Sequence, residues 1–267
     1  MLLLDCRAER KKDQVCSETE YQIVFERLRR LPQGIDHLVV QLGIPIAYPR
    51  MVFLETALES KFNPLVALGR AGSMGLSGFV NKFNADAELL DDLVTTTTGL
   101  RRRISDVMCN LLSSLQRERN AFVERLQHVA QEKRLRITFL SGDVHCAAVG
   151  LFKTYVKGKE SEVPPQADHR YMLNIVSSAI VNTPPPNGVL TMVSTLSTKT
   201  HRTLHHLKTD ETMVPIFTTD TNGGGAAKSK YIMGKRNWCA VTWDPATEEL
   251  EFDIRVEKRK GYGETTG

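Results

Sequence analysis

Short runs of apolar residues, each bounded by turn-forming residues, recur along the chain. Runs of this length are typical of strands that are buried on both faces of a sheet. The clearest, residues 136–140 (Arg-Ile-Thr-Phe-Leu), stops abruptly at Ser141-Gly142-Asp143. Three further runs predict strands of the same kind, at residues 2–7, 37–42 and 171–181.

Apolar positions at helical spacing predict helices between these strands. Residues 17–31 and 116–133 both have an apolar stripe, and Ser17 with Glu20 forms a capping pattern at the start of the first helix. Residues 51–58 predict a short helix and residues 189–207 a longer one. Helices that alternate with buried strands are typical of layered α/β folds.

Near its end the chain predicts a β-hairpin, because residues 238–243 and 250–256 have the spacing and composition of two paired strands. Loops are predicted at residues 67–83, 153–169 and 220–229, which are polar or rich in glycine and proline. The glycine-rich stretch at 67–83 lacks the strand–turn–helix order of a nucleotide cradle, so it does not favour phosphate binding.

Candidate chemistry is concentrated where the strand at residues 136–140 ends, in the sequence Gly142-Asp143-Val144-His145. Because side chains two apart on a strand point to the same side, Asp143 and His145 are expected to project together. A carboxylate beside an imidazole suits a metal ion. Spacing alone fits equally well a turn aspartate and a histidine satisfied by hydrogen bonds, so both interpretations stay open.

Other polar positions carry weaker signals. Asp5 and Arg7 share one face of the first predicted strand and Arg10 follows, a pattern that favours an ion pair at a strand end. Ser177 and Ser178 stand inside an apolar run, where hydroxyls need partners either at a site or, more commonly, in neighbouring backbone.

Histidines gather in the predicted helix at residues 189–207. His201 and His205 are four apart, a spacing that can chelate a metal. Histidines near a helix C-terminus also suit its dipole, and this structural interpretation is the one the sequence favours.

The composition is that of an ordinary globular protein. With 267 residues, 41% of them hydrophobic and 25% charged, the chain can bury a sizeable core. A net charge of +4 is too small to favour a nucleic-acid partner or an anionic membrane. Five cysteines without paired spacing fit a reducing compartment better than a disulfide framework. No uncharged run approaches a membrane span, so an intracellular and cytoplasmic protein is expected.

Five motifs together resemble the PhoD-like branch of the metallophosphoesterases, and they recur in the family's order over nearly the whole chain. They are Leu4-Asp5-Cys6-Arg7-Ala8-Glu9-Arg10, residues 43–50 (Gly-Ile-Pro-Ile-Ala-Tyr-Pro-Arg), residues 140–145 (Leu-Ser-Gly-Asp-Val-His), residues 177–186 (Ser-Ser-Ala-Ile-Val-Asn-Thr-Pro-Pro-Pro) and Arg236-Asn237-Trp238-Cys239.

The resemblance implies an α/β (α+β) fold in which two mixed β-sheets face each other with helices outside, a four-layer sandwich. It also implies hydrolysis of phosphate mono- or diesters by metal-activated water, with Asp143 and His145 as metal ligands and catalytic residues. The implied cofactors are divalent or trivalent cations of the calcium and iron types. Four further residues are implied as substrate-binding candidates: Arg7, Arg10, Ser178 and Asn182.

Two features depart from the family's pattern. The family's earlier metal ligands lie upstream of the strand that begins here at the first residue. The chain is therefore expected to be the C-terminal portion of one PhoD-like domain, incomplete at its N-terminus. Residues 94–115 stand where related chains have an Asp-His-Trp motif and are expected to be an atypical insert, and residues 258–267 a flexible tail.

These departures leave a second function open, a catalytically inactive fragment or binding module that lacks the upstream metal ligands. Part of a sandwich would expose an apolar sheet face, which predicts a protein partner or peripheral contact with a membrane.

Overall fold

The computed structural model describes residues 1–49 and 104–266, except residues 7, 9, 12, 159–160, 186, 205–207, 222–226 and 228. The chain divides into two compact units, Arg50–Arg117 and a larger unit made of Met1–Pro49 and Glu118–Gly267. Both β-sheets belong to the larger unit. The predicted helix at residues 51–58, the predicted loop at 67–83 and residues 94–103 of the predicted insert lie outside the described residues.

Parallel strands form one half of a large mixed sheet. In spatial order they are β1 (Leu2–Leu3), β2 (His37–Leu42), β3 (Arg136–Ser141) and β5 (Met172–Val176). The strands predicted at residues 37–42 and 136–140 are confirmed. The first and last predicted runs end earlier than expected, at Leu3 and Val176, so Ser177 and Ser178 follow β5 rather than lie within it.

Antiparallel strands complete the large sheet. β4 (Ala147–Thr154) pairs with β5 on one edge and with β7 (Thr209–Met213) and β8 (Ile232–Met233) on the other. β6 (His201–Leu204) pairs with β7 and is the last strand on that side.

The register of the parallel strands aligns their carboxyl ends. Leu42 of β2 lies opposite Ser141 of β3, and Ser141 lies opposite Val176 of β5. Each of these residues is the last of its strand, so the turns that follow meet at one edge of the sheet. Open α/β sheets bind ligands outside the carboxyl ends of their strands.

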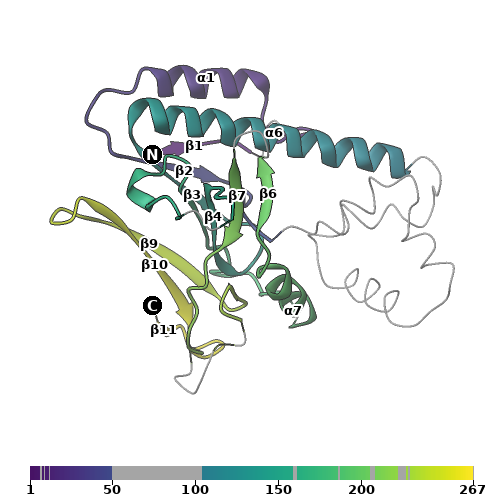
Figure 1. Cartoon of the computed structure of the whole chain (residues 1–267). Helices are drawn as coiled ribbons and strands as arrows, with labels where there is room; N and C mark the ends of the chain where they lie inside the picture. The colour runs from purple at the N-terminus through teal and green to yellow at the C-terminus, as the bar shows by residue number, and fades with distance from the viewer. Residues whose placement is uncertain are drawn as a thin grey trace. The chain divides into compact units, whose positions relative to one another are not determined.

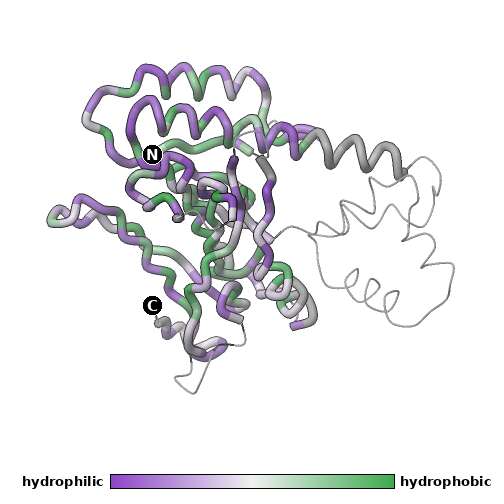
Figure 2. The backbone as a smooth tube through the Cα atoms, in the orientation of Figure 1, coloured by the Kyte–Doolittle hydropathy of each residue, from purple (hydrophilic) through white to green (hydrophobic). Residues whose placement is uncertain are grey.

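Two helices, α1 (Glu18–Arg29) and α6 (Ile104–Lys133), lie together over the large sheet (Figure 1). The hydrophobic colour is concentrated on the central strands beneath them (Figure 2). The Phe122 ring of α6 lies 5.4 Å from Tyr21 and 5.9 Å from Phe25 of α1, between centroids. Both helices share one core with the sheet, which includes Val24, Leu28, Val123, Leu126, Val40, Ile137, Phe139 and Phe152.

The start of α1 follows the predicted capping pattern. The Ser17 hydroxyl accepts a hydrogen bond from the Glu20 backbone N–H over 3.1 Å. No helix within the described residues has the length and apolar composition needed to cross a lipid bilayer.

A smaller antiparallel sheet consists of β9 (Asn237–Asp244), β10 (Glu249–Glu257) and β11 (Thr265–Thr266). This confirms the predicted hairpin. Thr265 and Thr266 lie in the segment that was predicted as a flexible tail. Ala147 of β4, Met233 of β8 and Val256 of β10 share one apolar cluster, which attaches the small sheet to the large one.

The predicted helix at residues 189–207 is wrong in its second half. Helix α7 covers Asn187–Leu196, and His201 lies on the strand β6, so helical spacing does not apply at His201. His205 and His206 lie outside the described residues. A short 3-10 helix, Pro165–Ala167, interrupts the predicted loop at residues 153–169.

Strands β4 and β7 were not predicted at all, and β7 shows why. Its buried face consists of Thr209, Glu211 and Met213, so strand alternation is present but is mostly polar. Glu211 is 3% exposed and pairs with Arg119 of α6 at 2.5 Å. An ion pair with a helix 92 residues away in sequence cannot be seen in a local hydrophobic pattern.

The architecture is therefore mixed α/β, with one large mixed sheet, one small sheet and few helices among the described residues. The four-layer sandwich implied by the resemblance is more specific than this architecture and stays a prediction.

Gly150, in the middle of β4, allows the segment after β2 to approach the sheet. A Cβ at this position would lie 2.1 Å from the Ala47 carbonyl oxygen, far inside contact distance. The Asn174 side chain also donates to that oxygen, over 2.9 Å. The absence of a side chain at Gly150 thus allows Ala47 to lie directly against β4.

We predict that Gly150→Ala lowers the free energy of unfolding by about 1–3 kcal/mol, because the methyl group displaces backbone. Chemical denaturation measures the change. Gly43→Ala is the matched control, since its nearest neighbour would be the Cys6 Cβ at 3.6 Å. Equal stability of the two variants would contradict the close approach.

Candidate functional site

A cleft of about 550 Å³ opens where the parallel strands end. Leu42, Ser141 and Gly142 line it from β2 and β3, and β9 forms its other wall. The polar lining residues are Gln41, Ser141, Ser177, Ser178, Asn182 and Asn237. Apolar lining includes the largely exposed side chains of Ile180, Val181 and Trp238. We call this feature the strand-end cleft.

Asp143 and His145 lie in a tight turn directly after β3, which ends at Ser141. Both residues have left-handed backbone, with φ of 79° and 53°, and the Val144 N–H donates to the Gly142 carbonyl over 3.1 Å. Strand alternation therefore does not apply to this pair, so the reason for expecting the two side chains to project together is wrong, and their joint role stays a prediction. Aspartate and histidine are among the non-glycine residues enriched in this conformation.

The His145 ring is held on both nitrogens. Nδ1 lies 3.2 Å from the Thr183 carbonyl oxygen, and Nε2 lies 3.2 Å from the Asn182 side-chain nitrogen. The tautomer that carries its proton on Nδ1 satisfies both contacts, because Nδ1–H then donates to the carbonyl and Nε2 accepts from the amide. Nε2 is thus the nitrogen with an electron pair available for a proton or a metal.

Ser178 links the two loops that meet at this edge. Its hydroxyl accepts from the His145 backbone N–H over 3.0 Å, and its own N–H donates to the Asn237 side chain over 3.1 Å. A Cβ at Gly142 would lie 3.3 Å from the Ser178 Cβ, so the loops touch. Of the residues named from the sequence, the structure brings His145, Ser178 and Asn182 together, with Asp143 half-buried in the same turn.

Asn237 holds two loops together, a role that its place in the motif Arg236-Asn237-Trp238-Cys239 does not predict. It is 2% exposed, and its side-chain oxygen accepts from the Ser177 hydroxyl at 2.8 Å as well as from Ser178. Its amide nitrogen donates to the Lys235 carbonyl over 2.8 Å. In the sequence, Asn237 is an asparagine just before an apolar strand, and this position alone does not predict that its side chain joins the loop after β5 to β9.

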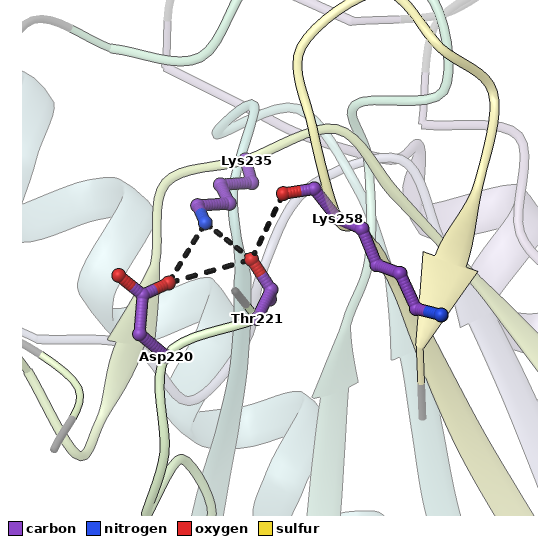
Figure 3. Close-up of polar contacts among 4 residues, drawn as sticks. All are labelled: Asp220, Thr221, Lys235 and Lys258. Atoms are coloured by element: carbon purple, nitrogen blue, oxygen red, sulfur yellow. Dashed lines mark hydrogen bonds and ion pairs between the residues drawn. The ribbon is translucent and has the colours of Figure 1, made fainter. Parts of the chain in front are cut away.

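The segment before Asn237 is held by a polar cluster (Figure 3). The Lys235 ammonium donates to Asp220 at 2.8 Å and to the Thr221 hydroxyl, and that hydroxyl donates to the Lys258 carbonyl over 3.4 Å. Hydrogen bonding to Lys235 lowers the pKa of Asp220 below its ordinary value. The cluster ties the beginning of β9 to the end of β10.

A second buried carboxamide supports the opposite side of the cleft. Asn174 of β5 is fully buried; it donates to Ala47 and accepts from the Ser141 hydroxyl over 2.9 Å. Arg119 Nε donates to the neighbouring Ile46 carbonyl over 2.7 Å. The loop after β2 is therefore anchored to β3, β5 and α6 at once.

Of the predicted site residues, Ser178 and Asn182 line the strand-end cleft, whereas Asp143 and His145 lie in the turn beside it and are not lining residues. The two candidate arginines are not placed at the cleft either. Arg7 lies outside the described residues, and Arg10 is exposed and is not among the residues that line the strand-end cleft. Their assignment to substrate binding stays a prediction.

The donor set for a metal can be assessed from the side chains. Within the described part of the chain, no three carboxylate, imidazole or thiol groups gather as a metal site requires. Asp143 and His145 are two donors on one turn, and the Nδ1 contact of His145 with a carbonyl is the usual way to orient a metal-binding imidazole. Catalytic metal sites normally have three or more protein ligands, so the described residues fit part of such a site.

Comparison with known proteins agrees with the sequence motifs. The Saccharomyces cerevisiae protein named "Uncharacterized protein YGR266W" is 41% identical over 259 residues, which cover 90% of this chain and 34% of the yeast protein. No solved structure matches the chain. A family model described as PhoD related phosphatase matches residues 1–71 and 66–265, nearly the whole chain. The family predicted from the motifs is thereby confirmed: this chain belongs to the PhoD related phosphatases.

Proposed function

We propose that the strand-end cleft is the part of a phosphatase site that binds and hydrolyses phosphate mono- or diesters. The observation that carries the proposal is the convergence of His145, Ser178 and Asn182 beside the aligned strand ends. Membership in the PhoD related phosphatases supports a phosphate ester as the substrate. Because the chain spans a minor part of its yeast relative, the activity is proposed for the family domain to which this chain contributes.

His145 is the central group of the proposed site. The Thr183 carbonyl holds its Nδ1 proton, so that Nε2 offers a basic electron pair. The Asn182 side-chain nitrogen lies 3.2 Å from Nε2. A ligand that binds Nε2 would displace this amide, and the amide N–H would then donate to a phosphoryl oxygen. Ser178 accepts a hydrogen bond from the His145 backbone N–H and itself lines the strand-end cleft, so His145 lies beside the cleft. Arg7 and Arg10 remain proposed phosphate-binding side chains because guanidinium groups pair well with phosphate.

Metal dependence is the second part of the proposal. Asp143 would contribute a carboxylate oxygen, which suits a calcium-type cation, and His145 a nitrogen, which suits an iron-type cation. A bound metal would supply positive charge for the phosphoryl oxygens and a more acidic water. Further ligands are needed to complete such a centre, and they are not among the described side chains.

A binding module without turnover is the other candidate function. The observation that favours it is that, among the described residues, Asp143 and His145 are two donors where a catalytic metal site has three or more. The two functions share the cleft and its phosphate-binding groups, and they differ in whether the ester bond is cleaved.

We predict that His145→Ala lowers kcat/KM for bis(p-nitrophenyl) phosphate by about 100-fold or more, measured with added calcium and iron. His128→Ala is the control, because His128 is an exposed residue of α6. Circular dichroism checks that both variants are folded. Full turnover by His145→Ala would refute the assignment, and phosphate binding without turnover by the unsubstituted chain would favour the binding module.

We also predict that Asn237→Ala lowers the free energy of unfolding by about 1–3 kcal/mol, because the Ser177, Ser178 and Lys235 groups lose a buried partner. Phosphate binding, measured by calorimetry, should weaken in parallel as the Ser178 loop loses its anchor. Thr242→Ala, at an exposed position on the same strand, should change neither quantity. If Asn237→Ala binds phosphate with the same affinity and has the same free energy of unfolding as the unsubstituted chain, Asn237 does not anchor the Ser178 loop.

A further inference from the structure

Two buried thiols stand at the ends of the loop that carries Arg7 and Arg10. Cys6 follows β1 and Cys16 immediately precedes Ser17, the cap of α1. The Cys16 thiol donates a hydrogen bond to the Cys6 sulfur, with 3.9 Å between the sulfur atoms. A disulfide bond has a sulfur–sulfur length of about 2.05 Å, so the atoms need to approach by about 2 Å.

The backbone around both cysteines is anchored from outside the loop. Glu118 of α6 accepts hydrogen bonds from the N–H groups of Val15 and Cys16, both at 2.9 Å, and from the Tyr21 hydroxyl at 2.8 Å. The Cys6 N–H donates to the Leu4 carbonyl over 3.0 Å. With the backbone held at these points, rotation of the two side chains is the movement that would bring the sulfur atoms together.

The surroundings make one sulfur the better nucleophile. Hydrogen bonds from the Cys16 thiol and then from the Gly43 N–H lower the pKa of Cys6 to about 7, although burial and the carboxylates of Glu20 and Asp5 oppose this shift. The pKa of Cys16 is raised by the same shared hydrogen bond, by burial, and by the charges on Cys6 and Glu20. The thiolate is the form of cysteine that attacks oxidants.

The other described cysteines have different partners. The Cys146 sulfur lies 3.1 Å from the Tyr48 hydroxyl, and the Cys239 thiol donates to the Ala240 carbonyl over 3.4 Å. Burial, followed by the charge of Asp253, raises the pKa of Cys239 to about 11. Neither therefore combines a favoured thiolate with an adjacent thiol.

We propose that Cys6 and Cys16 are an oxidation site, which forms a reversible disulfide in the presence of a hydroperoxide. The Cys6 thiolate attacks one peroxide oxygen and the O–O bond breaks, so that Cys6 becomes a sulfenic acid, and the departing hydroxide or alkoxide takes up the proton that Cys6 had released and leaves as water or an alcohol. The Cys16 sulfur then attacks the Cys6 sulfur, the S–O bond breaks, and the hydroxyl leaves with the Cys16 proton as water. Two thiols lose two electrons in total, and the peroxide gains them.

Oxidation at this pair also has a route to the strand-end cleft. Gly43 lines the cleft and lies against Cys6, where its backbone N–H helps to lower the pKa of the thiol. Disulfide formation draws the Cys6 sulfur toward Cys16 and weakens its contact with Gly43, and it closes the loop that holds Arg7 and Arg10. An effect of oxidation on catalysis rests on the proposed function, whereas the disulfide itself does not.

The test begins with the unsubstituted full chain, reduced and then treated with hydrogen peroxide. Mass spectrometry should show the loss of two hydrogen atoms, and a non-reducing peptide map should join the Cys6 and Cys16 peptides. Dithiothreitol should reverse both results. An unchanged mass, or a bond that joins any other pair among Cys6, Cys16, Cys109, Cys146 and Cys239, would overturn the proposal.

Matched variants assign the two roles. Cys146→Ser and Cys239→Ser should keep the disulfide, whereas Cys16→Ser should leave a Cys6 sulfenic acid that dimedone traps. Dimedone labelling on Cys16 in the Cys6→Ser variant, with none on Cys6 in the Cys16→Ser variant, contradicts the assigned order of attack.

Activity separates this inference from the proposed function. If the reduced chain hydrolyses bis(p-nitrophenyl) phosphate, we expect kcat/KM to change about tenfold on oxidation, since a displacement of about 1 Å at a site can cost as much as about 100-fold. Hydrolysis that is equal in both states disproves the link to the cleft but leaves the disulfide standing. Absence of hydrolysis in the reduced chain counts against the proposed function alone.

Discussion

The arrangement of the site depends on the parallel pairing of β2, β3 and β5 in one register. Leu42, Ser141 and Val176 end their strands opposite one another, and this alignment brings three turns from distant parts of the sequence to the same edge. The apolar side chains that α1 and α6 bury against these strands hold the register, because a shift by one residue would turn every buried side chain to the other face. The cleft is thus a consequence of the core.

Two buried carboxamide side chains hold the loops in place relative to these strands. Asn174 joins the end of β3 to the loop after β2, and Asn237 joins the loop after β5 to the small sheet. An amide suits such a position because it donates and accepts at once and needs no counter-charge. Each side of the cleft therefore has one neutral buried carboxamide among its polar connections.

Much of this could be predicted from the sequence where the signal is local. The apolar runs of β2 and β3, the cap at Ser17 and the hairpin near the C-terminus follow from short-range patterns. Where a prediction failed, the structure is decided by distant partners or by backbone geometry that a local sequence pattern does not contain. β7 hides its alternation because Glu211 is neutralised by Arg119, and the strand β6 continues a stretch that looked helical. His145 was identified for its residue type, but the expected side-by-side projection rested on strand geometry, whereas left-handed backbone sets its direction. Asn237 depends on partners 59 and 60 residues away, which no local pattern contains.

The neighbouring residues Glu118 and Arg119 together set the position of α6 along its own axis. Glu118 grips the segment before α1, while Arg119 contacts Ile46, Glu211 and the Phe152 ring. Sliding the helix along its axis by a single residue, about 1.5 Å, would break several of these contacts together. The axial position of α6 is therefore set at this point of the helix.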